Sequence, residues 1–177
     1  MAKKRLKSDL SVSGIEKLQE QIREYQTSLE SKVDIYARRL AQEGVLFAKY
    51  NVKDFDAVFV GDLLSSIKLR TGSKSKGKSV YFVVADSDHA AFVEFGTGYE
   101  GEEHPYSHPL PEGATWKYVT GYQIVNNAKK HIYGWFYERD GNVYFTEGMP
   151  SRPFMWNTSQ QLNMKAIQIA REVFGGN

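Results

Sequence analysis

An amphipathic stripe near the start of the chain is the feature that most limits how it can fold. Apolar side chains recur at steps of mostly three and four residues, at Ile15, Leu18, Ile22, Tyr25, Leu29, Tyr36 and Leu40. This spacing places them on one face of an α-helix. We therefore predict a long amphipathic helix from Ser13 onward, with an end or a kink at Gly44.

The same spacing resembles the seam of a coiled coil. Lys32 stands where the next seam residue belongs, with Val33 beside it. Because a heptad pattern must persist over several repeats to indicate a coiled coil, we favour a helix that packs across a sheet over an isolated coiled coil.

Length and composition indicate one folded domain that spans residues 1–177. Hydrophobic residues make up 41% and charged residues 25% of the chain, which argues against disorder along its whole length. The absence of cysteine excludes disulfides, thiolate catalysis and Cys-based zinc sites. The longest apolar run, residues 80–85, is far shorter than the roughly 20 residues of a membrane helix, so we expect a soluble, unsecreted chain with no membrane partner.

The middle of the chain has the pattern of a small sheet. Residues 80–85 have the β-branched and aromatic content of a buried strand, and the apolar residues 90–95 extend the predicted sheet core. A short helical turn is expected at 62–67. Residues 71–78 are small or charged, which is typical of a mobile loop.

The second half adds further strands and a closing helix. Residues 98–113 contain three prolines and predict an irregular loop, and 116–125 predict a strand. An Asp-Gly turn within 139–142 separates two aromatic runs and predicts a β-hairpin. From Phe154 the apolar spacing again predicts an amphipathic helix, so the order is helix, strands, helix.

Charge is distributed in blocks of opposite sign. Basic residues gather at the N-terminus and again at Lys68, Arg70, Lys74, Lys76 and Lys78, whereas the stretch from Asp86 to Glu112 contains acids and no Lys or Arg. Such patches govern encounters more than the net charge of +2 does.

Two short motifs stand out, at residues 91–98 (Ala-Phe-Val-Glu-Phe-Gly-Thr-Gly) and 151–155 (Ser-Arg-Pro-Phe-Met). Gly96 and Gly98 permit backbone angles that other residues resist, which allows a sharp turn. Pro153 is tolerated in a first helical turn, where Phe154 can anchor the helix to a core.

In this order, and after a long N-terminal helix, the motifs resemble those of the tail-completion and head–tail joining proteins of long-tailed bacteriophages, which are minor tail or minor capsid components. The likeness rests on two runs, Glu94, Phe95, Gly96, Thr97 and Gly98, and Arg152, Pro153 and Phe154. It implies an α+β fold in which the N-terminal and C-terminal helices pack on a small, mostly antiparallel twisted sheet with a β-hairpin insertion.

The resemblance also implies a role. We expect a non-enzymatic assembly protein of the virion neck or tail, present in the host bacterial cytoplasm during assembly, that forms a ring, expected to be a hexamer, and binds other neck or tail proteins. No cofactor is expected. The segment 99–148 is longer than the connection typical of that family, and we treat it as an insertion.

Candidate residues for chemistry are few. Glu94 fits either a subunit contact or a solvent-facing strand position, and Arg152 is a candidate ion-pair partner for it. His104 and His108 have a metal-ligand spacing, but Pro105 and Pro109 follow them directly and disfavour a helix there. Asp86, Asp88 and His89 lack an accompanying nucleophile or phosphate-loop motif, so we predict neither a metal site nor an enzyme.

Three alternatives remain open for the basic 68–78 segment: a solvated loop, weak contact with DNA phosphates in a nucleic-acid-binding accessory role, or contact with the acidic region of a neighbouring subunit. The aromatic insertion from Trp116 to Phe145 is either extra sheet core or a surface that binds another virion protein, and we favour the interface. The predicted assembly contacts are Lys74, Lys76, Lys78, Glu100, Glu102, Glu103, Trp135 and Tyr137.

Overall fold

Helix α1 (Val12–Asp54) is the longest element of the molecule, at 43 residues. The computed structural model describes residues 9, 11–55, 60–72, 79–118 and 134–175. The Ser11 hydroxyl accepts the N–H of Gly14 at 3.0 Å and so caps the first turn. We expected an end or a kink at Gly44, but α1 does not end there and continues for ten more residues. The absence of a Cβ at Gly44 leaves room for the side chains of Val83 and Leu162.

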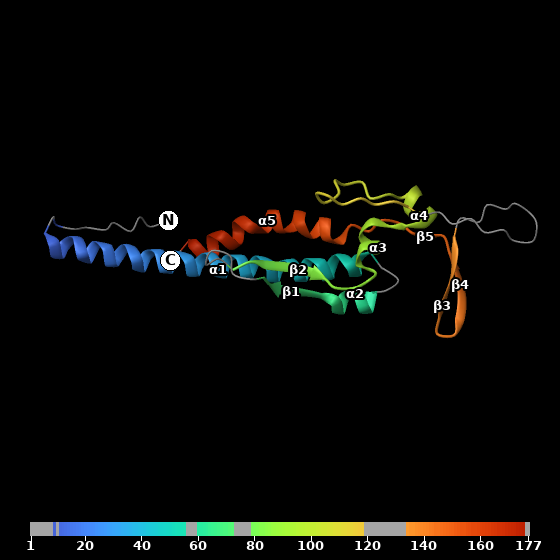
Figure 1. The fold of residues 1–177 in the computed structure, drawn as a ribbon, viewed down its shortest axis with the longest axis horizontal. Coiled ribbons are helices and arrows are strands. Elements are labelled where there is room, and N and C mark those ends of the chain that lie inside the picture. Colours follow the sequence, from blue (N-terminus) through green and yellow to red (C-terminus); the bar gives the residue numbers. More distant parts are fainter. Residues whose placement is uncertain (1–8, 10, 56–59, 73–78, 119–133, 176–177) are drawn as a thin grey trace, which may run out of the picture.

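Helix α5 (Phe154–Phe174) lies antiparallel against the second half of α1 (Figure 1). At one end of the pair Asn51 of α1 meets Phe154 and Thr158, and at the other the rings of Tyr36 and Phe174 are 5.8 Å apart. The predicted C-terminal helix is therefore present, with α1 as its main packing partner.

A ribbon of two antiparallel strands, β1 (Ile67–Thr71) and β2 (Tyr81–Ala85), packs on the second half of α1, next to the short helix α2 (Val60–Ser66). The core lies where these elements meet α5, and its fully buried side chains are Ala48, Val52, Leu63, Ile67, Val93 and Phe154. The α+β fold and the packing of α1 on a sheet are thus confirmed.

A second ribbon is formed by β3 (Trp135–Arg139) and β4 (Asn142–Thr146), as the Asp-Gly turn predicted. Asp140 and Gly141 at its tip have φ values of 51° and 74°. The two ribbons belong to separate two-stranded sheets, and the hairpin points away from the helices (Figure 1). The two-residue strand β5 (Gly148–Met149) follows it.

Two expectations for the middle of the chain were wrong. The apolar residues 90–95, which we assigned to the sheet core, form helix α3 (Ala90–Phe95), and the segment predicted as irregular begins with helix α4 (Gly98–Glu103). A short apolar run fits a strand and a buried helical turn equally well, and here Val93 and Glu94 both face the interior from one helix. Residues 116–118 are not a strand, and 119–125 lie outside the described residues.

No helix within the described ranges is long and apolar enough to cross a membrane.

Candidate functional site

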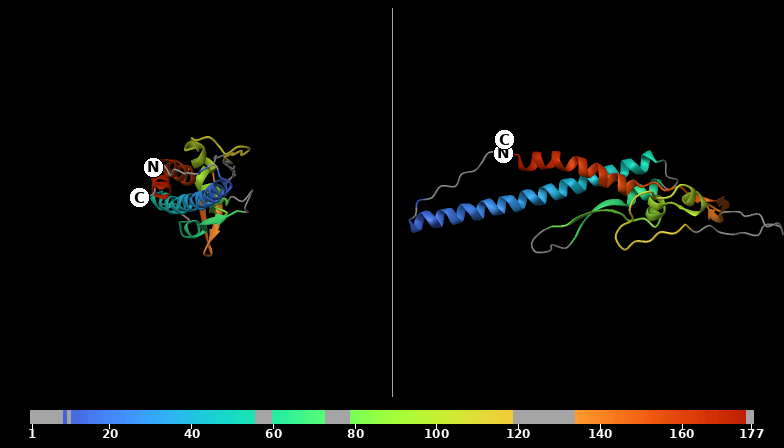
Figure 2. Two further views of the ribbon diagram at one scale, coloured as in Figure 1. Left: turned by 90° about the vertical axis from the view of Figure 1, so that its left-hand side faces the viewer. Right: turned by 90° about the horizontal axis from the view of Figure 1, so that it is seen from above.

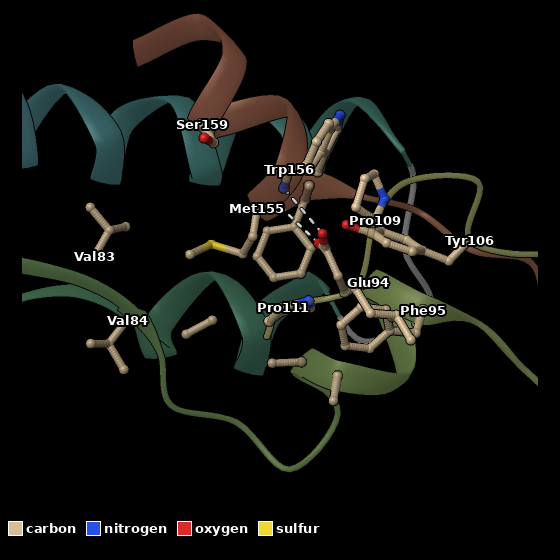
Figure 3. A pocket seen from close by; sticks show the side chains of 15 residues that line it. Val83, Val84, Glu94, Phe95, Tyr106, Pro109, Pro111, Met155, Trp156 and Ser159 are labelled. Atoms are coloured by element: carbon tan, nitrogen blue, oxygen red, sulfur yellow. Dashed lines mark hydrogen bonds between the residues drawn. The ribbon is translucent and has the colours of Figure 1, made fainter. Parts of the chain in front are cut away.

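The carboxylate of Glu94 joins α3 to the start of α5 (Figure 3). Its two oxygens accept the backbone N–H groups of Met155 at 2.8 Å and Trp156 at 3.1 Å. The first N–H groups of a helix have no partner within the helix, and a negative charge is stabilised there. Pro153, at the N-cap position of α5, provides no side-chain cap. Glu94 therefore caps α5 from a different helix.

Backbone contacts extend this joint to both sequence motifs. The N–H of Arg152 donates to the carbonyl oxygen of Val93 at 2.8 Å, and the Ser151 hydroxyl donates to the carbonyl oxygen of Glu94 at 2.7 Å. Phe154 is buried in the core beside them, as the anchoring role predicted. Segments 91–98 and 151–155 thus form one unit, which we call the Glu94 joint.

Glycines make the close approach at the joint possible. Gly96 and Gly98 have φ values of 82° and 63°, in the region that favours glycine. A Cβ on Gly96 would lie 2.7 Å from the backbone nitrogen of Ser151, and one on Gly98 would lie 2.5 Å from the Glu147 carbonyl oxygen. The turn predicted at these glycines is present, and the second motif packs directly against it.

The ion pair between Glu94 and Arg152, which we considered either within a subunit or across to a neighbour, is not formed within the chain, where the Glu94 oxygens accept the α5 backbone N–H groups. Nη1 of Arg152 is buried without a hydrogen-bond partner. The solvent-facing strand position considered for Glu94 is also wrong, since the residue is on a helix and only 7% exposed.

Burial decides the electrostatics of Glu94. Loss of hydration raises the pKa of its carboxyl above the ordinary value of 4.5, and this outweighs the two backbone N–H groups, which lower it. Burial also raises the pKa of the Tyr106 hydroxyl, and the charge of Glu94 acts in the same direction.

An open, mostly apolar groove of about 640 Å³ lies beside the joint. Its walls are β2, α3, the first turns of α5 and residues 106–111, with Glu94, Phe95 and Trp156 among the lining side chains (Figure 3). The His108 ring stacks on Trp156 at 4.6 Å, and Phe95 packs against Tyr106 at 4.9 Å. Such a groove suits apolar groups, while Glu94, already hydrogen-bonded, is poorly placed to move a proton.

The predicted assembly residues are dispersed. Glu100, Glu102 and Glu103 lie on α4, the latter two exposed, while Trp135 and Tyr137 share one face of the hairpin, where Tyr137 stacks on Tyr144. Lys74, Lys76 and Lys78 lie outside the described residues.

Two cations of the basic segment already have a partner within the chain. Lys68 and Arg70 both pair with Asp86, at 2.8 and 2.7 Å. Asp86, one acid of the acidic block, therefore forms its ion pairs within the subunit.

Among the residues that the structure describes, no group of three or more His, Asp or Glu could hold a metal ion. His104 ends α4, where its N–H donates to the carbonyl oxygen of Glu100, and its own carbonyl oxygen accepts the N–H of Ser151. The backbone of His104 and the ring of His108 therefore contact the elements around the joint.

Sequence reasoning missed a buried polar cluster between the long helices. The Asn51 amide nitrogen lies 3.2 Å from the Phe154 carbonyl oxygen and 3.1 Å from both Thr158 Oγ1 and Gln161 Oε1. The only signal for it was a polar residue on the core side of an otherwise apolar helix face. For Glu94 the corresponding signal was a single acid inside an apolar run.

No family model matches the chain, and neither the curated proteins nor the solved structures include a match to it.

Proposed function

We propose that the chain is a non-enzymatic virion assembly protein of a long-tailed bacteriophage, which completes the tail or joins head to tail at the neck as a ring. The observation that carries the proposal is the Glu94 joint. The family resemblance rests on two motifs, and these motifs bind each other through hydrogen bonds. One such bond joins Ser151 to Glu94, which lie 57 positions apart in the chain. The two motifs form one structural unit, which supports reading them as parts of a single pattern.

The hairpin supports a function based on protein contacts. Phe136, Val143 and Phe145 lie on one face of it and are 54%, 69% and 40% exposed. A two-stranded hairpin is marginally stable in water by itself, and a contiguous exposed apolar patch on a projecting element is typical of a binding surface. We name these three residues the hairpin patch.

Ring closure requires two different surfaces of neighbouring copies to meet. The hairpin patch is one candidate surface. The exposed acids of α4, Glu102 and Glu103, are another, which a basic neighbour carrying Lys74, Lys76 and Lys78 would complement in charge.

Virus production by a phage that encodes a double variant, Phe136→Lys with Val143→Lys, tests the proposal. We expect unjoined heads and tails in electron micrographs and a fall in infectious particles of at least tenfold. The matched control is Leu46→Lys, which charges an apolar residue of α1 that is 62% exposed and should leave the yield unchanged. Normal joining by the hairpin variant would contradict the proposed role of the patch.

Removal of the whole gene separates this proposal from a nucleic-acid-binding role. Complete virions without the protein would overturn the assembly function. A DNA-binding accessory would instead leave joining intact, and the purified chain would bind DNA with an affinity that falls steeply with salt.

A further inference from the structure

Within the part of the chain that the structure describes, the apolar stripe of α1 is covered along only part of its length. Helix α5 ends at Phe174, whose ring packs on Tyr36, and Arg39 forms an ion pair with Glu172 in the last turn of α5. The first half of α1 extends well beyond the end of α5 in two perpendicular views (Figures 1 and 2).

The uncovered part of the stripe is apolar and exposed. Its residues, which we name the free stripe, are Ile15, Leu18, Ile22, Tyr25, Leu29 and Val33. Five of them are between 41% and 51% exposed, and Leu18 is partly buried. Single exposed apolar residues are normal on a protein surface, but a continuous row at helical spacing has the form of a helix-pairing seam.

We propose that the free stripe binds the free stripe of a second copy of this chain, with the two helices antiparallel. The free stripe continues the surface that α5 already covers from Tyr36 onward. A helix of a second copy would therefore extend an existing antiparallel helix–helix interface.

The charges of α1 favour a second copy over a charged partner. Between Leu18 and Leu29, the positions that flank the stripe are occupied by uncharged residues: Gln19, Gln21, Gln26 and Ser28. The charged residues of this part of α1 lie farther from the seam: Glu16, Lys17, Glu20, Arg23 and Glu24. Flanking charges normally set the choice of partner in helix pairing. Two identical stripes meet here without like-charge repulsion, and an oppositely charged partner gains nothing at these positions.

The position of α5 selects the antiparallel orientation. In a parallel pair the α5 helices of both copies would lie between the two α1 helices from Tyr36 onward and force them apart. In an antiparallel pair Ile22 faces Tyr25 of the second copy and Leu18 faces Leu29. Ile15 then lies opposite Lys32, with Val33 beside it. Each free stripe then covers the other from end to end, and the two-fold axis falls between Arg23 and Glu24.

The interface is of adequate size for a specific but modest association. Specific interfaces bury about 1,000 Å² or more in total, and two stripes with six large side chains each reach roughly that order. We therefore expect a dimer that dissociates on dilution. This pairing concerns the free protein and goes beyond the proposed role in the virion, on which it does not depend.

Sedimentation of the purified full-length chain over a range of concentrations tests the pairing. The unmodified chain should shift from monomer to dimer as its concentration rises, and Ile22→Lys or Ile22→Gln should weaken the dimer at least tenfold with unchanged helical circular dichroism. Ile167→Lys, on the exposed face of α5, and the hairpin double variant should dimerise normally, which separates this contact from the proposed ring contact. A chain that stays monomeric throughout, or a dimer unaffected by both Ile22 variants, would overturn the proposal.

Because the chain has no cysteine, introduced thiols test the orientation directly. A mixture of Leu18→Cys and Leu29→Cys proteins should form disulfide-linked heterodimers under mild oxidation, while each protein alone should form few. The pair Glu20→Cys and Thr27→Cys, on the opposite face of α1, is the matched control and should not crosslink. Efficient crosslinking of Leu18→Cys with itself would show a parallel pair and contradict the antiparallel arrangement.

Discussion

The carboxylate of Glu94 accepts the backbone N–H of Met155 at 2.8 Å, although 61 positions separate the two residues in the chain. One acid thereby holds α3, the glycine turn after it and the start of α5 in a fixed arrangement. The stability of the chain should depend on this contact more than on any exposed charge.

Replacement of Glu94 by alanine removes the acceptor of two α5 N–H groups that then have no partner. A buried unpaired group costs about 1–3 kcal/mol, so we expect the free energy of unfolding to fall by about 2–4 kcal/mol in urea titrations. Glu94→Gln, which keeps one acceptor oxygen, should lose less. The control is Glu20→Ala on the exposed face of α1, which should change stability little; an equal loss in Glu20→Ala and Glu94→Ala would contradict the assignment.

The stability of the folded chain should respond to pH through Glu94 with a defined sign. Burial raises the pKa of this carboxyl in the folded chain above 4.5, so its contribution to stability is fully present below that value and is lost as the pH rises through the folded pKa. Relative to Glu94→Gln, the unmodified chain should therefore lose stability as the pH rises above 4.5. Unfolding titrations of both proteins at several pH values measure this difference. An unmodified chain that gains stability relative to Glu94→Gln as the pH rises would refute the prediction.

The exposed Asp86 acts in the opposite direction and is a useful contrast. Its hydrogen bond and ion pair with Lys68, together with the charge of Arg70, lower the pKa of its carboxyl below 3.8. The stability that Asp86 contributes is present above 3.8 and is lost as the pH falls through the folded pKa. In the same titrations Asp86→Asn should be less stable than the unmodified chain above pH 3.8, this difference should disappear as the pH falls, and salt should diminish it.

Gly96→Ala should destabilise the joint by strain and by a backbone clash. The positive φ costs about 1–3 kcal/mol for a non-glycine residue, and the added Cβ would press on the nitrogen of Ser151. Gly113 also has a positive φ, of 77°, but a Cβ there would meet nothing within 4 Å. Gly113→Ala therefore measures the strain alone, and thermal unfolding should show a clearly larger loss for Gly96→Ala.

Asn51→Ala should weaken the contact between α1 and α5. The Asn51 side chain is buried and bonded to Phe154, Thr158 and Gln161, so its loss leaves unsatisfied groups and should cost about 2 kcal/mol of unfolding free energy. Asn163→Ala, an exposed site on α5, is the matched control and should be neutral or slightly stabilising. Equal unfolding midpoints for the two variants would contradict a structural role for Asn51.

Several features of this protein were predictable because neighbouring residues determine them. The apolar spacing from Ile15 to Leu40 determined a long helix, since helical periodicity is a local property. The Asp-Gly pair at 140–141 determined the hairpin, because its tip requires positive φ values. Gly96 predicted the turn for the same reason.

The tertiary structure decided what depends on contacts between distant residues. Residues 90–95 became a helix because that conformation buries Val93 in the core and points Glu94 at the free N–H groups of α5, a target that no local pattern reveals. The length of α5, which ends opposite Tyr36, decided which part of the α1 stripe is covered. Periodicity determines that an apolar face exists, whereas the packing of another element decides whether that face is buried or exposed.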